Sequence, residues 1–344
     1  MNQPTILVWG AGAIGGTIGG YLLRAGQDVL LVDWDADHVA AINQSGLRIQ
    51  GPVATFTQPA RASLPHQVTG TYHAIYLCVK AHHTRSAAQM LAPHLAEDGY
   101  VVSFQNGLNE LVIAQVVGAA RTMGAFVNFG ADYLSPGIVE YSGRGAFVIG
   151  ELDGAMTPRL HALHRLALIC EPNAIATDNI MGYLWGKLGY GALLFATALT
   201  NASICEALAA PAPRMLFRKL AGEAVAVALA QNVAPLGFNG YWPEAFAKAA
   251  SPEQADASFA AMVAHNATSA KTHSGIWRDL AVRKRRTEVD AQLGPIVEFG
   301  QAAGIATPVM RHLIAMIHEI EDGGRKLDFA NLAELERRAL ALGE

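Results

Sequence analysis

Three glycines near the start of the chain have the spacing of a phosphate-binding loop. Residues 10–15 read Gly-Ala-Gly-Ala-Ile-Gly, which matches G-x-G-x-x-G, and they follow an apolar run typical of a buried strand. The first glycine permits a tight turn, the second lets the backbone approach a pyrophosphate, and the third lets a helix pack closely on the strand. The helix N-terminus also favours phosphate. These features predict a dinucleotide site formed by Gly10, Gly12, Ala13, Ile14 and Gly15.

An acidic residue after the next predicted strand indicates which dinucleotide binds. Asp33 follows the first glycine by about 20 residues, a separation at which a carboxylate accepts hydrogen bonds from the adenosine ribose. This carboxylate would repel the 2′-phosphate of NADP. Asp35 adds negative charge, and the sequence has no Arg or Lys between Arg24 and Arg48. We therefore predict that NAD(H) is preferred, with NADP(H) as the weaker alternative.

The elements that position these residues alternate along the first half of the chain. Apolar runs at 5–9, 28–32, 74–79 and 99–104 are separated by helical stretches, and such alternation favours a parallel, doubly wound sheet. The later pattern is helical, over 177–200, 213–232, 253–270, 284–302 and 308–321. The predicted fold class is therefore α/β, with an N-terminal Rossmann doubly wound sheet (1–174) followed by an all-α C-terminal domain (175–344).

One segment departs from this alternation. Residues 137–150 combine β-forming side chains with a glycine-containing centre, so we predict a hairpin at the far edge of the sheet, with its turn at 142–145. After one further helix near 158–169 the strand pattern ends. We expect the two domains to adjoin along a helix-mediated seam.

Four further motifs follow in a specific order. Val79-Lys80-Ala81 and Gln105-Asn106-Gly107-Leu108 come after two of the predicted strands. Leu184-Trp185-Gly186-Lys187-Leu188 lies early in the helical half, and Arg286-Thr287-Glu288-Val289-Asp290 lies late in it. Together with the glycine motif, this order resembles the ketopantoate reductase (2-dehydropantoate 2-reductase) family over nearly the whole chain.

The resemblance implies NAD(P)H-dependent reduction of a 2-oxo acid to a 2-hydroxy acid. It implies that Lys187 is the catalytic proton donor and that Glu288 assists it and contacts the substrate. It also implies that Asn106 is a third catalytic residue, near the nicotinamide and substrate, and that Lys80 lies near the cofactor. These residue types suit the reaction, because hydride transfer to a ketone builds negative charge on oxygen that an ammonium group can stabilise and protonate.

The chain departs from that family on the helix of Lys187. The positions four and eight residues later, commonly asparagine in the family, are Gly191 and Phe195. Residues so spaced share one face of a helix. We therefore expect Lys187, Gly191 and Phe195 to bind the substrate, in a pocket that favours 2-oxo acids with apolar or aromatic side chains over ketopantoate.

Two smaller departures lie late in the chain. The serine pair expected before the last motif is Ser274-Gly275, and the stretch 279–288 is one residue longer than the resemblance leads us to expect. Ser274 and Glu288 complete the predicted substrate-binding set, and Ser274 or Asn201 are alternative replacements for the lost amides.

Other functions fit parts of the pattern. The enzyme could work oxidatively, as an NAD-dependent 2-hydroxy acid dehydrogenase on an apolar or aromatic substrate. A 3-hydroxy acid or sugar-phosphate dehydrogenase of similar architecture would also use a lysine from a helical domain, but the Thr287-Glu288 element argues against it. A dinucleotide-sensing protein without catalysis would not need Lys187.

The composition fits a soluble protein whose partners are small molecules. Hydrophobic residues make up 51% of the chain, charged residues 16%, and the net charge is −4. This allows a large core and attracts neither nucleic acid nor an anionic membrane. The expected partner is a 2-oxo or 2-hydroxy acid, the expected location is cytoplasmic, and a homodimer is one option. The widely separated cysteines and the histidine pairs predict no metal site.

Overall fold

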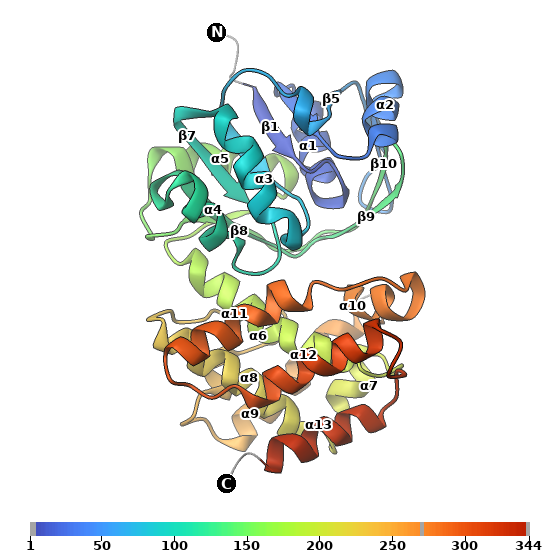
Figure 1. Cartoon of the computed structure of the whole chain (residues 1–344), viewed down its shortest axis with the longest axis vertical. Coiled ribbons are helices and arrows are strands. Elements are labelled where there is room, and N and C mark those ends of the chain that lie inside the picture. The colour runs from blue at the N-terminus through green and yellow to red at the C-terminus, as the bar shows by residue number, and fades with distance from the viewer. Residues whose placement is uncertain (1–4, 269–271, 342–344) are drawn as a thin grey trace. The chain divides into compact units, whose positions relative to one another are not determined.

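The computed structural model describes residues 5–268 and 272–341 (Figure 1). The chain divides into two compact units, Met1–Ile180 and Met181–Glu344. The sequence places the boundary between 174 and 175, a few residues before the division in the structure. Each unit has its own core and is described by itself.

The first unit is built on an eight-stranded sheet in the order β12-β11-β8-β7-β6-β1-β2-β5. The six strands from β5 to β8 are mutually parallel, in the order of a Rossmann doubly wound sheet, so the predicted fold class is confirmed. One edge departs from the expected parallel sheet, since β11 is antiparallel to β8. The strands are β1 (Ile6–Trp9), β2 (Val29–Val32), β5 (Arg61–Ser63), β6 (Tyr72–Leu77), β7 (Leu95–Ser103), β8 (Thr122–Val127), β11 (Phe147–Glu151) and β12 (Ile175–Ala176).

Helices cover both faces of this sheet, because successive side chains of a strand point to opposite sides. In β1, Ile6 and Val8 pack into the cluster that includes α1 (Ala13–Arg24) and α5 (Pro158–Cys170). Leu7 and Trp9 pack into the opposite cluster with α3 (Thr84–Leu91) and α4 (Asn109–Val117). α3 and α4 lie side by side on that face (Figure 1). Burial on both faces explains the continuous apolar runs in these strands.

A second, four-stranded sheet was not predicted, and the predicted hairpin turn at 142–145 is wrong. The order of this sheet is β4-β3-β10-β9, and the hairpin joins β9 to β10 through Pro136 and Gly137. Residues 144–146 instead carry the chain from β10 to β11 in the main sheet. Gly137 has φ +77°, the left-handed backbone that a tight turn requires. The strands are β3 (Leu47–Gln50), β4 (Phe56–Gln58), β9 (Gly130–Ser135) and β10 (Ile138–Gly143).

Strand β10 packs against α1 as part of the second sheet rather than pairing in the main sheet. Val139 and Tyr141 of β10 are buried in the same cluster as Ile18 and Leu22 of α1. Helix α2 (Ala36–Ser45) lies beside β5. The two-residue strand β12 is a further correction, because residues 175 and 176 were assigned to the helical domain and instead pair with β11.

The second unit is helical. Between its helices the described residues form one isolated β-bridge, from Phe238 to Tyr241. The five predicted helices are present, but the fourth begins at Val289 rather than at 284. The helices are α6 (Ile180–Thr197), α7 (Ile204–Ala209), α8 (Arg214–Ala230), α9 (Pro252–Ala267), α10 (Gly275–Trp277), α11 (Val289–Ala302), α12 (Pro308–Glu321) and α13 (Ala330–Ala341).

The late start of α11 has a local cause. Residues Arg278–Arg283 form a π-helix, η6, in which each turn holds one residue more than an α-helical turn. Lys284 then adopts left-handed backbone with φ +51° and ends it. The π-helix overlaps the stretch 279–288, which the family resemblance marks as one residue longer than expected, and it offers a physical way to accommodate that residue.

A partly buried glutamate of α8 fixes the start of α12. Glu223 of α8 accepts hydrogen bonds from the N–H groups of Val309 and Met310, at 2.9 and 2.8 Å. Burial raises the pKa of Glu223 to about 7.

Of the helices in the described part of the chain, none is both long and apolar enough to cross a membrane.

Candidate functional site

The three glycines of the predicted loop have different surroundings. A Cβ at Gly10, where φ is +103°, would lie 2.8 Å from backbone atoms of Cys78 and Val79. A Cβ at Gly15 would lie 1.9 Å from the carbonyl oxygen of Gly10. At Gly12, by contrast, a Cβ would meet no atom within 4 Å. Gly10 and Gly15 are thus required by packing, whereas Gly12 leaves open space in front of the N-terminus of α1.

Asp33 lies at the end of β2, directly beside this loop. One of its carboxylate oxygens accepts a hydrogen bond from the N–H of Ala11 at 2.9 Å, and the other accepts from the N–H of Asp35 at 3.1 Å. Asp35 caps α2 and accepts a hydrogen bond from the Tyr133 hydroxyl, which lowers the pKa of Asp35. Asp33 therefore shapes the glycine loop in addition to presenting negative charge there.

A buried histidine that the sequence analysis did not identify holds the same loop. His38 of α2 is fully buried, and its Nε2 lies 3.0 Å from the carbonyl oxygen of Ala11. Its Nδ1 accepts a hydrogen bond from the N–H of Gly137 at 2.8 Å. Because a carbonyl can only accept, Nε2 carries the proton and the ring is neutral in this arrangement. Both backbone polar groups of Ala11 are therefore bonded, its N–H to Asp33 and its C=O to His38.

Lys80 and Asn106 follow two neighbouring strands, β6 and β7. Since β1, β6 and β7 are adjacent and parallel, the glycine loop and these two residues all lie at the carboxyl ends of these strands. Gln105, which the sequence analysis named in a motif without giving it a role, connects the ends of these two strands. Gln105 is buried, and its amide donates to the carbonyl of Val79 at 2.9 Å and to the hydroxyl of Thr84 at 2.8 Å.

In the second unit, the residues around Lys187 are explained by packing on α6. Trp185 is buried and packs edge-on against Phe299 of α11, with ring centroids 5.9 Å apart. A Cβ at Gly186 would lie 1.9 Å from the carbonyl oxygen of Leu236, so that only glycine allows this approach. Lys187 itself is half-buried.

The two family departures on α6 differ in their surroundings. A Cβ at Gly191 would meet only Gln292 Oε1, at the ordinary contact distance of 3.7 Å, so there is room for a Cβ. Phe195 is 0% exposed, which places it in the core and gives it no surface to offer a ligand in this structure. Gln292, from the first turns of α11, is a polar group near Gly191 that the sequence analysis did not consider.

The two residues considered as substitutes for the lost amides are engaged elsewhere. The Ser274 hydroxyl accepts a hydrogen bond from the N–H of Trp277 at 3.1 Å, capping α10. The Asn201 amide donates to the carbonyl of Leu327 at 3.2 Å.

Glu288 occupies the N-cap position of α11, one helical turn before Gln292. Its carbonyl accepts a hydrogen bond from the N–H of Gln292 at 3.0 Å. Gln292 thus lies near two of the predicted candidates, with its amide oxygen beside Gly191 and its backbone N–H bonded to Glu288.

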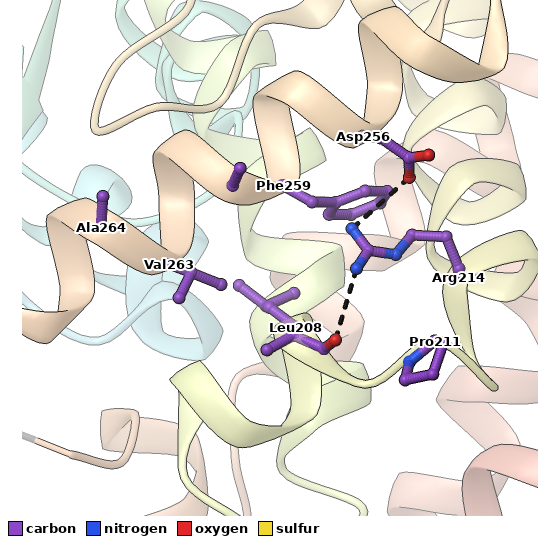
Figure 2. Close-up of a pocket in the computed structure, with 9 residues that line it drawn as sticks. Leu208, Pro211, Arg214, Asp256, Phe259, Val263 and Ala264 are labelled. Atoms are coloured by element: carbon purple, nitrogen blue, oxygen red, sulfur yellow. Dashed lines mark hydrogen bonds and ion pairs between the residues drawn. The ribbon is translucent and has the colours of Figure 1, made fainter.

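A separate cavity of about 570 Å³ lies between α7, α8 and α9 (Figure 2). Arg214 lies there between Asp256 and Phe259, 3.5 Å from the Asp256 carboxylate and 4.8 Å from the centre of the Phe259 ring. The predicted site residues do not line this cavity, and the proposed reaction does not use it.

Comparisons with known proteins agree with the order of motifs. Two family models match, "Ketopantoate reductase PanE/ApbA" at residues 6–154 and its C-terminal counterpart at 179–321. A 2-dehydropantoate 2-reductase of Halobacterium salinarum is 28% identical, over 93% of this chain and 99% of that protein. One of Archaeoglobus fulgidus is also 28% identical, over 94% of this chain and all of that protein.

Solved structures share the architecture. A PanE/ApbA family ketopantoate reductase from Ralstonia eutropha superposes with a TM-score of 0.78 at 28% identity, covering 93% of this chain and 99% of that one. A D-mandelate dehydrogenase, solved with NADH and anilino(oxo)acetate, has a TM-score of 0.79 at 22% identity with the same coverage, and it shows the fold alone. The chain therefore belongs to the ketopantoate reductase family and is an NAD(P)-dependent oxidoreductase.

Proposed function

We propose that this enzyme reduces a 2-oxo acid to the corresponding 2-hydroxy acid, with Lys187 as the proton donor. The observation that carries the proposal is that a family model matches each unit, and that the second match contains both Lys187 and Glu288. A nicotinamide cofactor would supply the hydride. The open space at Gly12, before the N-terminus of α1, fits the pyrophosphate of such a cofactor.

Each candidate residue has a distinct task in this reaction. The ammonium group of Lys187 hydrogen-bonds the ketone oxygen, stabilises the charge that develops on it, and donates the proton that completes the hydroxyl group. Glu288 orients Lys187 and contacts the substrate. Asn106 and Lys80, at the sheet edge beside the glycine loop, orient the cofactor. The decisive assay follows NADH or NADPH consumption with a panel of 2-oxo acids, and a panel with no turnover would remove the proposal.

We further propose that the cofactor is NAD(H), on the basis of Asp33 and of the sequence around it. The wild-type enzyme should then have a higher kcat/KM for NADH than for NADPH. Trp34 is 58% exposed, so Trp34→Arg should place a cation where a 2′-phosphate would lie without disturbing packing. We expect this change to lower the ratio of kcat/KM for NADH to kcat/KM for NADPH by about tenfold, or ~1.4 kcal/mol.

The choice of variant matters, because Asp33 also holds the N–H of Ala11. Asp33→Ala would weaken binding of both dinucleotides through the loop, whereas Trp34→Arg tests charge alone. Trp34→Gln is the matched control and should leave the ratio unchanged. A wild-type preference for NADPH of tenfold or more would show that Asp33 does not select against the 2′-phosphate.

The substrate side chain is proposed to occupy the space at Gly191. An asparagine there would have offered an amide, whereas glycine offers volume, with Gln292 as the remaining polar neighbour. We therefore expect 2-oxo acids with bulky apolar or aromatic side chains to have a higher kcat/KM than ketopantoate. Each buried CH₂ would contribute about 0.8 kcal/mol, and a buried hydroxyl without a partner would lose about 1–3 kcal/mol.

Gly191→Asn tests this directly. The added Cβ meets only Gln292 Oε1, at 3.7 Å, so the backbone can accept a Cβ here. The ratio of kcat/KM for ketopantoate to kcat/KM for an apolar 2-oxo acid should rise. Running the hydroxy acids with NAD in the same series shows whether the oxidative direction is faster. If ketopantoate is already the best substrate of the wild-type enzyme by tenfold, the apolar pocket is ruled out while the reductase assignment stands.

A further inference from the structure

A buried carboxylate holds the backbone on which Glu288 sits. The N–H and the hydroxyl group of Thr287 both donate to Glu321 Oε1, each at 2.7 Å. The Glu321 side chain, at the end of α12, is only 1% exposed. Two bonds to the residue immediately before Glu288 fix the direction in which the chain enters α11.

The other oxygen of Glu321 extends the network to the residues after Glu288. Glu321 Oε2 lies 2.8 Å from Nδ1 of His318, and Nε2 of the same ring lies 2.9 Å from Asp290 Oδ1. A carboxylate only accepts, so bonds to both carboxylates require protons on both ring nitrogens, and the imidazole must be positively charged. His318 therefore links the positions that flank Glu288 on both sides.

The charges around His318 favour its protonated form. Burial lowers the pKa of His318, but the hydrogen bonds to Glu321 and Asp290 and their negative charges outweigh it, so the pKa is raised above its ordinary value. One further cation lies close by, since Arg286 is 3.6 Å from Glu321 and 2.7 Å from Asp322. The cations His318 and Arg286 thus lie among three carboxylates, of which that of Glu321 is buried.

We propose that His318 and Glu321 are positioning residues that hold segment 287–290, and with it Glu288, in its working conformation. This inference rests on the proposed function, because it assumes that Glu288 takes part in the reaction. His318 and Glu321 contact Thr287 and Asp290 rather than the reacting atoms, so they act through Glu288.

The network has a defined dependence on pH. Since the folded pKa of His318 is raised, the stability that it contributes is fully present below the unfolded value and is lost as pH rises through the folded one. The difference in melting temperature between wild type and His318→Gln should therefore be largest in mildly acidic buffer and should shrink in alkaline buffer.

The test is a double-mutant cycle on kcat in the full-length enzyme. His318→Gln should lower kcat by about 10- to 100-fold, the cost of a misplaced catalytic group, with the KM for the cofactor nearly unchanged. Glu288→Gln alone should lower kcat at least as much as His318→Gln does. The double variant should have a kcat no lower than that of Glu288→Gln. If the two effects multiply instead, His318 does not act through Glu288, and the positioning role is overturned while the proposed function stands.

Controls separate this role from general stability. Glu334→Gln breaks an ion pair of similar length, 2.8 Å to Arg325, away from segment 287–290, and should leave kcat unchanged. Asp290→Asn removes the negative charge that favours protonated His318, at a side chain that is 76% exposed, so the fold should survive and kcat should fall, as for His318→Gln. Unchanged kcat in Asp290→Asn and His318→Gln would overturn the inference. Unchanged kcat in Glu288→Gln would remove Glu288 from the proposed function itself.

Discussion

Replacing Lys187 with alanine should lower kcat by about 10²–10⁴, the range for loss of a general acid. The expected loss is large because the ammonium group both stabilises the developing oxyanion and supplies the proton, and neither task has an equivalent at an alanine. The dissociation constant for NADH should stay nearly unchanged, since the glycine loop and Asp33 belong to the first unit. Stopped-flow turnover together with NADH fluorescence titration measures both quantities.

Two comparisons make this result specific to Lys187. Lys248→Ala removes an exposed lysine of the same unit and should leave kcat and the melting temperature at their wild-type values. Glu288→Ala should cost less than Lys187→Ala and act partly through the KM of the 2-oxo acid. A Lys187→Ala enzyme with normal kcat would eliminate the proposed acid.

Four central strands of the Rossmann sheet, β1, β2, β6 and β7, were predictable because they stand out as apolar runs, whereas β5, β8 and β12 were not predicted. The second sheet was not predicted either, since β3, β4, β9 and β10 are three to six residues long and several are half-exposed. The β-forming side chains of 137–150 were recognised, but they do not specify which strands pair with each other. β10 pairs with β3 and β9, while β11 pairs with β8 and β12.

Site residues with a conformational signature were the easiest to predict. The glycine loop is recognisable because only glycine fits its turn and its packing. His38 and Glu321 were missed, and Gln105 was seen in a motif but given no role, because each makes its important contact with a residue distant in sequence. His38 and Gly137, for example, are 99 positions apart. The residue types of such partners carry no local signal that separates them from ordinary polar residues of a helix or strand.

Helix α6 illustrates a different limit of predicting a site from sequence. Spacing placed Lys187, Gly191 and Phe195 on one face of the helix, but α6 is buried on nearly all sides. A shared face on such a helix need not be a pocket wall. Gly191 borders space and a Gln292 amide, whereas Phe195 is enclosed in the core.

Two similar substitutions in the glycine loop should have different effects, since Gly15→Ala should lower stability and Gly12→Ala should lower NADH affinity. Gly15→Ala would place a Cβ 1.9 Å from the Gly10 carbonyl oxygen and 2.9 Å from the Cβ of Cys78, so α1 must shift away from the sheet. Overpacking of this kind costs about 1–3 kcal/mol or more, and the melting temperature should fall even without cofactor. At Gly12 the new Cβ meets no protein atom within 4 Å, so Gly12→Ala should melt like the wild type.

Cofactor binding should separate the two variants further. If the open space at Gly12 is where the pyrophosphate approaches the backbone, a methyl group there should raise the dissociation constant of NADH by about tenfold or more. Gly294→Ala is the control for exchanging glycine with alanine, because a Cβ at this helical position also meets no atom within 4 Å and lies in the other unit. It should change neither NADH affinity nor stability adversely. Wild-type NADH affinity in a well-folded Gly12→Ala protein would mean that the dinucleotide does not approach the backbone at Gly12, and the dinucleotide site would have to be placed elsewhere along this sheet edge.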